Sequence, residues 1–235
     1  MNVIDKKKYK KNLEILREKI NFYEKISKKS IQQLLRKRSI LNKQQSVKSK
    51  LCKINELNDW KINNGKIVHK SGQFFSVEGV KIKNAKREVS SWDQVILNQK
   101  HGGILAIIMR ETKSRGIEFL LNLRSEPGDK DLKFCPSFSA TQSNINLAHG
   151  GKKTDLSEII LKLKGAEIIA KSTHNEEGAR FWRKKNENWI VKIKDPFNKE
   201  ISKENFVWVN YWQIKKLTME DCVINPFVKT ILFMI

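Results

Sequence analysis

The chain of 235 residues is poor in cysteine and contains no long hydrophobic run. Its three cysteines, Cys52, Cys135 and Cys222, are far apart, odd in number and without the CxxC or Cys/His spacing of a zinc site. A disulfide framework is therefore not expected, and the reducing cytoplasm is the simplest compartment. No stretch of 18 apolar residues is available for a membrane span, and the basic segment Met1–Lys11 lacks the apolar region of a signal peptide.

Acidic residues are also scarce: 25 Asp and Glu stand against 47 Lys and Arg, a formal net charge of +22. One interpretation is nucleic-acid binding, because clustered cations neutralise phosphates; the other is a composition that is simply rich in Lys, Asn and Ile. Residues 1–53 hold 17 Lys and Arg and 4 Asp and Glu, a net +13. We therefore expect a basic helical N-terminal extension over residues 1–53 and a single folded unit over residues 54–235.

The N-terminal region has a helical pattern. Apolar residues recur at steps of three and four, from Leu13 to Tyr23 and again from Ile31 to Leu35, with lysines between them. Ser27–Ser30 is the expected break between two helices, and Gln33 lies three residues after Ser30, as in a capping box. This region either packs its apolar stripe against the folded unit or forms a basic arm.

From Trp60 onward the pattern predicts an α+β fold with a mostly antiparallel sheet. Runs rich in Phe, Val and Ile predict strands, and two of them, joined by the polar segment Glu111–Arg115, predict a hairpin. The expected strands are Gln73–Val77, Val80–Ile82, Gly103–Met109, Ile117–Leu123, Ala166–Ala170 and Trp189–Lys194. The expected helices are Asp155–Lys164 and Tyr211–Leu217, and an apolar run, Val228–Ile235, ends the chain.

Three polar clusters stand beside strand-like sequence. The first, Arg124–Asp129, contains a Glu-Pro-Gly turn, which either fixes a functional carboxylate or is a simple turn. The second, Cys135–Asn144 followed by His149, has the hydroxyls and amides that suit sugar binding, or is a loop that caps the next helix. The third, His174–Gly178 with Phe181–Asn188, combines adjacent carboxylates with cations and aromatics, or is a charged turn.

In their order along the chain, these strings resemble the NDP-hexose 2,3-dehydratase family of deoxysugar biosynthesis. The resemblance spans roughly residues 55–235. It is carried by His69–Val80, Trp92-Asp93-Gln94 with Gln99, Gly103-Ile104-Leu105, Glu126-Pro127-Gly128, Pro136, Ala140–Asn144, His149-Gly150-Gly151, Glu176, Gly178, Phe181, Lys184, Asn186, Asn188, Asn225 and Thr230-Ile231-Leu232. The chain departs from the family in having one unit where members usually carry two in tandem. It also has Ser139 in place of Gln, Ile145 in place of Tyr, and His174–Glu177 in place of a Gln-Ser-Glu-Gln run.

The resemblance implies loss of water from a nucleotide-linked 4-keto-6-deoxyhexose, typically the dTDP-4-keto-6-deoxyglucose. A base removes the C3 proton, the C2 hydroxyl departs, and the reaction uses no metal, nicotinamide or other cofactor. The residues expected to exchange protons are Glu126, His149, Glu176 and Glu177. The residues expected to bind substrate are Trp92, Gln94, Arg124, Thr141, Asn144, Trp182, Lys184, Asn186 and Asn188; of these, Arg124 and Lys184 are assigned to the diphosphate.

By the same resemblance the fold is Nudix-like, a mixed, mostly antiparallel sheet flanked by helices. The Nudix hydrolase signature is absent, which disfavours magnesium-dependent diphosphate hydrolysis. A single unit is expected to find its partner in a second chain, giving a homodimer through Val228–Ile235 and the N-terminal helices. Two other functions compete: a non-catalytic sugar-nucleotide-binding subunit, suggested by Ser139, Ile145 and His174, and a nucleic-acid-binding protein, suggested by the basic extension.

Overall fold

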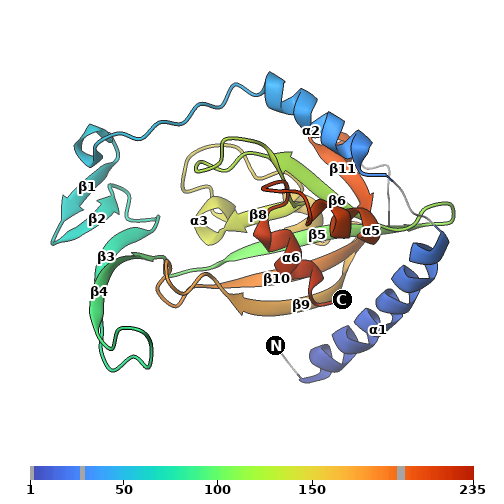
Figure 1. Cartoon of the computed structure of the whole chain (residues 1–235), viewed down its shortest axis with the longest axis horizontal. Helices are drawn as coiled ribbons and strands as arrows, with labels where there is room; N and C mark the ends of the chain where they lie inside the picture. Colours follow the sequence, from blue (N-terminus) through green and yellow to red (C-terminus); the bar gives the residue numbers. More distant parts are fainter. Residues whose placement is uncertain (1–2, 27–29, 195–198) are drawn as a thin grey trace.

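The structure is a computed structural model that describes residues 3–26, 30–194 and 199–235. Two sheets form its framework (Figure 1). The large sheet has the strand order β11-β6-β5-β10-β9, with β7 added beside β6 and β8 beside β5. Its strands are β5 (Gly103–Thr112), β6 (Gly116–Arg124), β7 (Lys133–Pro136), β8 (Phe138–Thr141), β9 (Ala166–Asn175), β10 (Lys185–Ile193) and β11 (Phe206–Asn210). All its pairings are antiparallel except that of β5 with β10. This mixed architecture confirms the predicted α+β fold class.

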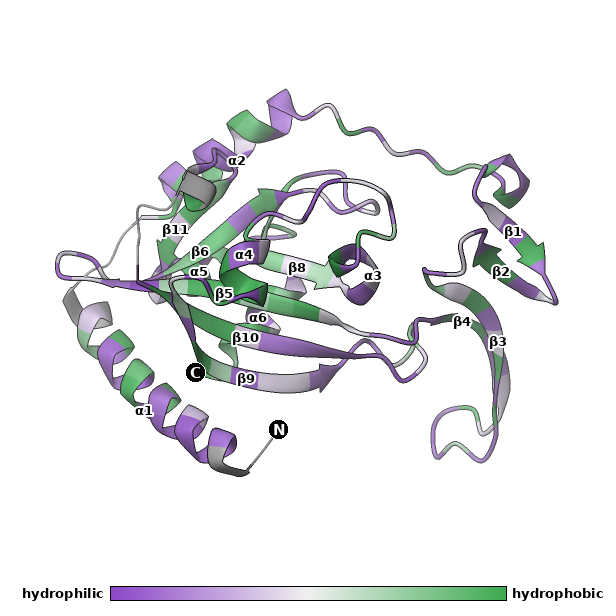
Figure 2. Ribbon diagram, turned by 180° about the vertical axis from the view of Figure 1, so that it is seen from behind, coloured by the Kyte–Doolittle hydropathy of each residue, from purple (hydrophilic) through white to green (hydrophobic). Residues whose placement is uncertain are grey.

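Both faces of the large sheet are buried. Side chains alternate across a strand, so Leu105, Ile107 and Met109 of β5 join one hydrophobic cluster while Ala106 and Ile108 join the other. The first cluster is covered by α1 (Val3–Ile26), α5 (Tyr211–Leu217) and α6 (Pro226–Leu232), and the second by α4 (Ser157–Leu161). Figure 2 shows hydrophobic residues along β5 and β6 and alternating with hydrophilic ones along α1.

The first N-terminal helix packs against the large sheet. Leu16 and Ile20 of α1 are buried in the first cluster, and Tyr23 lies over Gly116 at the β5–β6 turn. Gly116 has φ 70°, and a Cβ there would collide with the Tyr23 ring, so the contact requires glycine. The apolar stripe thus packs on the folded unit. Most of the predicted break at Ser27–Ser30 lies outside the described residues, and α2 (Gln32–Gln44) follows.

The small sheet has the order β1-β2-β3-β4, with all pairs antiparallel. Its strands are β1 (Trp60–Asn63), β2 (Lys66–His69), β3 (Ser76–Ile82) and β4 (Trp92–Asn98), preceded by the 3₁₀ helix η1 (Ile54–Glu56). It meets the rest of the molecule through the segment between β9 and β10. Leu97 N–H donates to the Arg180 carbonyl (2.7 Å), and Trp182 N–H donates to the Leu97 carbonyl (2.8 Å).

Some predicted elements differ from the observed ones. The helix predicted at Asp155–Lys164 is shortened to Ser157–Leu161 because Leu156 and Leu163 adopt left-handed conformations. The strands predicted at Gln73–Val77 and Val80–Ile82 are one strand, β3, that begins at Ser76. A second 3₁₀ helix, η2 (Lys199–Ser202), and the four-residue helix α3 (Gln142–Ile145) complete the described elements. Within them, no helix is both long and apolar enough to cross a membrane.

Half of the apolar side chains in the C-terminal run Val228–Ile235, which was predicted to make a dimer contact, are buried within their own chain. Val228, Ile231 and Leu232 lie on the inner face of α6 and are buried in the first hydrophobic cluster of their own chain. They are therefore unavailable to a second chain. Phe233, just past the helix, is 94% exposed.

Candidate functional site

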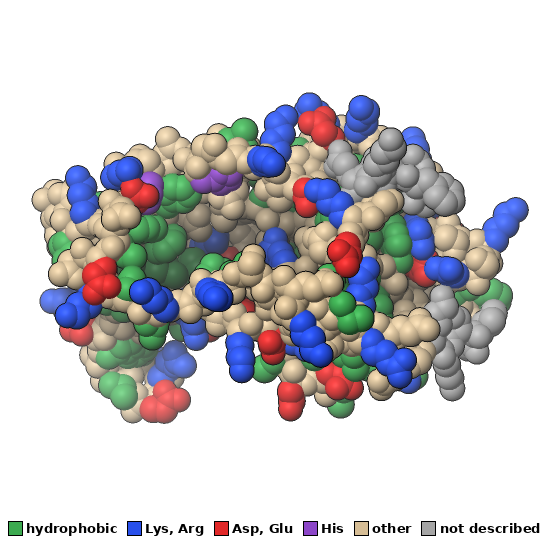
Figure 3. Space-filling view, turned by 90° about the horizontal axis from the view of Figure 1, so that it is seen from above, with side chains coloured by type: hydrophobic (Ala, Val, Ile, Leu, Met, Phe, Trp, Pro, Cys, Tyr) green, Lys and Arg blue, Asp and Glu red, His purple; other side chains and the backbone are tan. Residues whose placement is uncertain are grey.

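Three cavities lie beside the junction of the two sheets. The polar cavity (870 Å³) is bordered by Ser76, Glu78 and Asn98, and the aromatic cavity (660 Å³) by Val80, Ile82, Trp92, Gln94 and Ile96. These are alternate residues of β3 and β4, so the two cavities lie along one face of the small sheet. Figure 3 shows this side of the molecule hollowed between the small sheet and the rest of the chain, with hydrophobic side chains on one wall.

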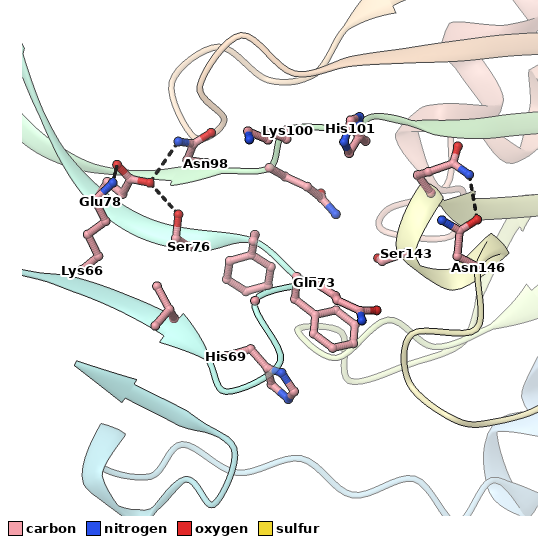
Figure 4. A pocket seen from close by; sticks show the side chains of 16 residues that line it. Lys66, His69, Gln73, Ser76, Glu78, Asn98, Lys100, His101, Ser143 and Asn146 are labelled. Carbon is pink, nitrogen blue, oxygen red and sulfur yellow. Dashed lines mark hydrogen bonds and ion pairs between the residues drawn. The ribbon is translucent and has the colours of Figure 1, made fainter. Parts of the chain in front are cut away.

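Glu78 is fixed as an anion at one end of the polar cavity (Figure 4). Its Oε1 accepts hydrogen bonds from Ser76 Oγ (2.6 Å) and Asn98 Nδ2 (2.9 Å), and its Oε2 lies 2.7 Å from Lys66 Nζ. The hydrogen bond from Lys66, followed by those from Ser76 and Asn98, lowers the pKa of Glu78 to about 2. Such a carboxylate stays charged near neutrality and is a poor proton acceptor there.

Three separate segments supply the other polar groups of this cavity. His69 and Gln73 come from β2 and the loop after it, Lys100 and His101 from the segment between β4 and β5, and Ser143 from α3 (Figure 4). The His69 ring contacts Phe74 edge-on at 4.6 Å between centroids, and its Nδ1 lies 2.8 Å from Ser71 Oγ. The cavity therefore holds two histidines among amides and hydroxyls.

The aromatic cavity combines indole rings with guanidinium groups. Arg183 lies over the Trp182 ring at 4.6 Å and Arg87 lies near the Trp92 ring at 6.0 Å. Gln94 joins its walls: its Oε1 accepts from Trp92 Nε1 (2.9 Å) and its Nε2 donates to the Ala179 carbonyl (2.8 Å). Flat aromatic rings next to cationic groups suit a ligand that carries a nucleobase and a phosphate group.

The third cavity (360 Å³), here called the asparagine cavity, lies between the β9–β10 pair and α6. Glu176 borders both this cavity and the aromatic one. Its Oε2 lies 3.2 Å from Lys184 Nζ and accepts a hydrogen bond from Asn186 Nδ2, and both charged side chains are below 10% exposed (Glu176 9%, Lys184 7%). Asn188 also borders this cavity, and its Oδ1 is buried with no hydrogen-bond partner among the described residues.

Two glycines bring β5 against the start of β10. Gly103 N–H donates to Asn186 Oδ1 (2.9 Å), and a Cβ on Gly102 would collide with the Lys185 carbonyl oxygen. Since only glycine permits this approach, Gly102 and Gly103 hold Asn186 in place and, through it, Glu176.

The structure brings most of the predicted residues together around Glu176. Trp92, Gln94, Trp182 and Lys184 border the aromatic cavity, and Glu177, Asn186 and Asn188 border the asparagine cavity. The residues from β10 and the segment before it come together because β9 pairs with β10. Trp92 and Gln94 lie beside them because β4 contacts the segment between these two strands. Within this group Glu177 is 63% exposed and lies 3.4 Å from Arg180.

Other predicted residues lie apart from these cavities. Arg124 and Glu126 pair with each other at the end of β6 (2.6 Å). His149 is exposed, and its Nδ1 accepts from Gly151 N–H (2.8 Å). Thr141 caps α3 by accepting from Asn144 N–H (3.4 Å), which is a structural role. None of these five side chains is among those that border the three cavities, so their predicted roles stay predictions.

Several bordering residues were not predicted as site residues. They are Lys66, Glu78, Asn98, Lys100 and His101 in the polar cavity and Phe227 and Thr230 in the asparagine cavity. Glu78 and Thr230 lie in strings that carry the family resemblance, but no local pattern assigned a role to any of these residues, and the tertiary fold brings their segments together. Among the described residues, no three His, Cys, Asp or Glu side chains gather as metal ligands would.

The family model for NDP-hexose 2,3-dehydratase matches residues 28–235, so the chain belongs to this family. Similar proteins include the dTDP-4-dehydro-6-deoxy-alpha-D-glucopyranose 2,3-dehydratases of Saccharopolyspora spinosa (29% identical over 180 residues) and Amycolatopsis orientalis (32% over 174 residues). The matches cover 75% and 72% of this chain, respectively. Each covers 36% of the relative, so the chain spans little more than a third of the length of these proteins. The matched region begins before the predicted unit boundary at residue 54 and includes α2.

Proposed function

We propose that this chain catalyses the 2,3-dehydration of a nucleotide-linked 4-keto-6-deoxyhexose. The observation that carries the proposal is Glu176, a carboxylate that is almost buried at the border of two cavities and is contacted by Lys184 and Asn186. Membership of the dehydratase family supports it, as do relatives whose names give the dTDP-linked sugar as substrate.

The reaction needs a base near C3 and a group that stabilises negative charge on the C4 oxygen. The C4 ketone acidifies the C3 proton, and the charge left by its removal moves to that oxygen. Glu176 is the proposed base, and the Lys184 ammonium is the proposed partner of the enolate oxygen. Glu126 and Glu177 are weaker candidates because each pairs with an arginine and is more exposed, at 38% and 63%.

The aromatic cavity suits the nucleotide. Trp92 and Trp182 offer flat surfaces for the nucleobase. The Arg87 and Arg183 guanidinium groups beside them offer hydrogen bonds to a diphosphate. The sugar would then enter the asparagine cavity past Glu176, where Asn188 Oδ1 can accept a hydroxyl hydrogen. Loss of water next to a ketone is redox-neutral, so the step as written needs no oxidant.

The finer features of the fold and assembly are also proposals. A mixed sheet with helices on both faces supports a Nudix-like fold for residues 54–235. A homodimer is proposed with Phe233, which is 94% exposed just past α6, as a candidate contact. Light scattering of the purified chain would give twice the monomer mass, and a monomer at micromolar concentration would contradict the homodimer. A cytoplasmic location stays a prediction.

The test is incubation of the purified chain with dTDP-4-keto-6-deoxyglucose, followed by mass spectrometry for loss of water. Glu176→Gln keeps the size of the side chain but removes the base, and should lower the rate ~10²–10⁴-fold. Glu220→Gln is a matched control, since Glu220 is exposed and borders none of the three cavities. Binding without product in the wild type would instead favour the non-catalytic binding subunit. A large loss of the dehydration rate in Glu126→Gln, with no loss in Glu176→Gln, would identify Glu126 as the catalytic base instead.

A further inference from the structure

The side chain of Asn186 connects the start of β5 to Glu176. Its Oδ1 accepts a hydrogen bond from Gly103 N–H (2.9 Å), and its Nδ2 donates to Glu176 Oε2. A backbone N–H can only donate, so the atom that it contacts is the amide oxygen, and the atom that faces Glu176 is the amide nitrogen. The backbone of β5 therefore fixes the orientation of the Asn186 amide.

The surroundings of Asn186 leave its amide little freedom. The side chain is in a residue that is only 5% exposed, and β5 pairs with β10 directly after it, from Ile104 opposite Glu187 onward. Both polar atoms of the Asn186 amide contact the protein. Asn188 differs in this respect, because its Oδ1 has no hydrogen-bond partner among the described residues. Asn186 is thus built to hold a neighbouring group.

The group that it holds is one oxygen of the Glu176 carboxylate. Lys184 Nζ lies 3.2 Å from Oε2, which is also the atom that accepts from Asn186, and the Glu176 side chain is 9% exposed. The last torsion of a glutamate side chain is broad, so a carboxylate turns easily unless contacts hold it. With Oε2 held, Oε1 has a defined direction at the border of the aromatic and asparagine cavities.

We propose that Asn186 is a positioning residue for the catalytic base, a role that rests on the proposed function. By holding Oε2, Asn186 makes Oε1 the oxygen of Glu176 that removes the C3 proton of the sugar. A base must lie within hydrogen-bond reach of the proton that it removes, and a displacement of about 1 Å can lower the rate ~10²-fold. The amide transfers no proton itself and affects the rate only through Glu176.

A double-mutant cycle separates this role from direct contact with the substrate. Asn186→Ala should lower kcat for the dehydration of dTDP-4-keto-6-deoxyglucose ~10²-fold and leave KM near the wild-type value. In the Glu176→Gln protein the same substitution should cause little further loss, because the group that Asn186 positions is already absent. A rise in KM alone, or the same loss in both backgrounds, would overturn the proposal.

Asn186→Asp tests the donor function by its pH dependence. An ionised carboxylate at this position can still accept from Gly103 N–H but repels Glu176, whereas a proton shared between the two carboxylates restores the donor. The dehydration rate of Asn186→Asp, divided by that of the wild type at the same pH, should therefore rise as the pH falls. Both proteins share the other charged and titratable side chains that border the two cavities, so the ratio removes their effect. These are Arg87, His174, Glu177, Arg183, Lys184 and Lys185. A ratio that does not change with pH would contradict the donor function.

Asn122→Ala is the matched control for the loss of a buried amide. Asn122 is 8% exposed in β6, its Oδ1 accepts from Asn205 Nδ2 (2.7 Å), and it borders none of the three cavities. Asn122→Ala and Asn186→Ala should both lower the melting temperature, but only Asn186→Ala should lower the dehydration rate of the folded protein. An equal loss of rate in both variants would overturn the proposal, because destabilisation would then explain both. A wild type without dehydratase activity would overturn the proposed function, and this role with it.

Discussion

The two sheets of this chain are built in different ways. In the large sheet, Gly116 to Leu123 of β6 are all buried, because hydrophobic clusters cover both faces. In the small sheet, Ile96 is the one buried residue among the four strands. Polar and aromatic contacts hold it instead, such as those of Glu78 and the rings of Trp60, His69 and Phe75. The large sheet therefore acts as a stable scaffold, and the small sheet as a less stable wall of two cavities.

The largest expected effect is in the large sheet. Phe119 is fully buried, so Phe119→Ala should lower the free energy of unfolding by about 3–5 kcal/mol, through lost burial and the cavity left behind. Val95→Ala, at a side chain 73% exposed on the small sheet, should change it by less than about 0.5 kcal/mol. Denaturant titration measures both. Equal midpoints for the two variants would show that the sheets contribute alike and would break the comparison.

The reactivity of the Cys135 thiol tests how well the large sheet excludes solvent. Burial in the large sheet raises the pKa of its thiol to about 11, so it stays protonated and protected at neutral pH. Cys52 and Cys222 are exposed. We expect two thiols to be alkylated quickly in the native wild type and the third only on unfolding, and Phe119→Ala to speed the third reaction. Rapid alkylation of Cys135 in the wild type would contradict the rigid scaffold.

A smaller effect is expected where the sheets meet. Gln94 accepts from Trp92 and donates to the Ala179 carbonyl, so Gln94→Ala removes both hydrogen bonds at a cost of about 1–2 kcal/mol. The change should appear as faster amide hydrogen exchange in β4 and in residues 176–184, with little change in β5 and β6. Gln94→Glu is the matched control, because a carboxylate still accepts from Trp92 but cannot donate to Ala179. Faster exchange throughout the large sheet would mean that the two sheets unfold as one unit.

The sequence patterns predicted the large sheet better than the small one. The β5–β6 hairpin and the helix Tyr211–Leu217 were predicted well because long apolar runs and a clear helical period mark them. The β1–β2 hairpin was missed although Asn64-Gly65, with φ values of 47° and 72°, is a recognised turn signal. Its strands have four residues each and face solvent, so they lack the apolar alternation that identifies a half-buried strand. The parallel pairing of β5 with β10 joins distant segments and has no local signal.

The site residues also divide into those predicted from one stretch of sequence and those that only the fold brings together. Glu176, Lys184, Asn186 and Asn188 were predicted from one stretch of sequence, and the antiparallel β9–β10 ladder places that stretch on one face. The polar cavity was missed although His69 and Glu78 lie in the string His69–Val80, because His101 and Ser143 come from other segments that meet this string only in the folded chain. Arg124 and Glu126 satisfy each other beside their own turn, which no sequence pattern distinguishes from a substrate contact.

The smallest expected effect concerns how the small sheet responds to acid. Lys66, Ser76 and Asn98 lower the pKa of Glu78 from the ordinary 4.5 to about 2, so its charged form is favoured in the folded state. A depressed pKa contributes stability that is fully present above the unfolded value and is lost as the pH falls from about 5 towards 2. Because solvent screens this partly exposed group, we expect a loss of about 1 kcal/mol or less, confined to β2–β4. Glu78→Gln should be slightly less stable at pH 7 and equal to the wild type near pH 2, measured by hydrogen exchange in β3. A difference between the two proteins that persists at pH 2 would show that hydrogen bonding, rather than the charge of Glu78, stabilises this wall.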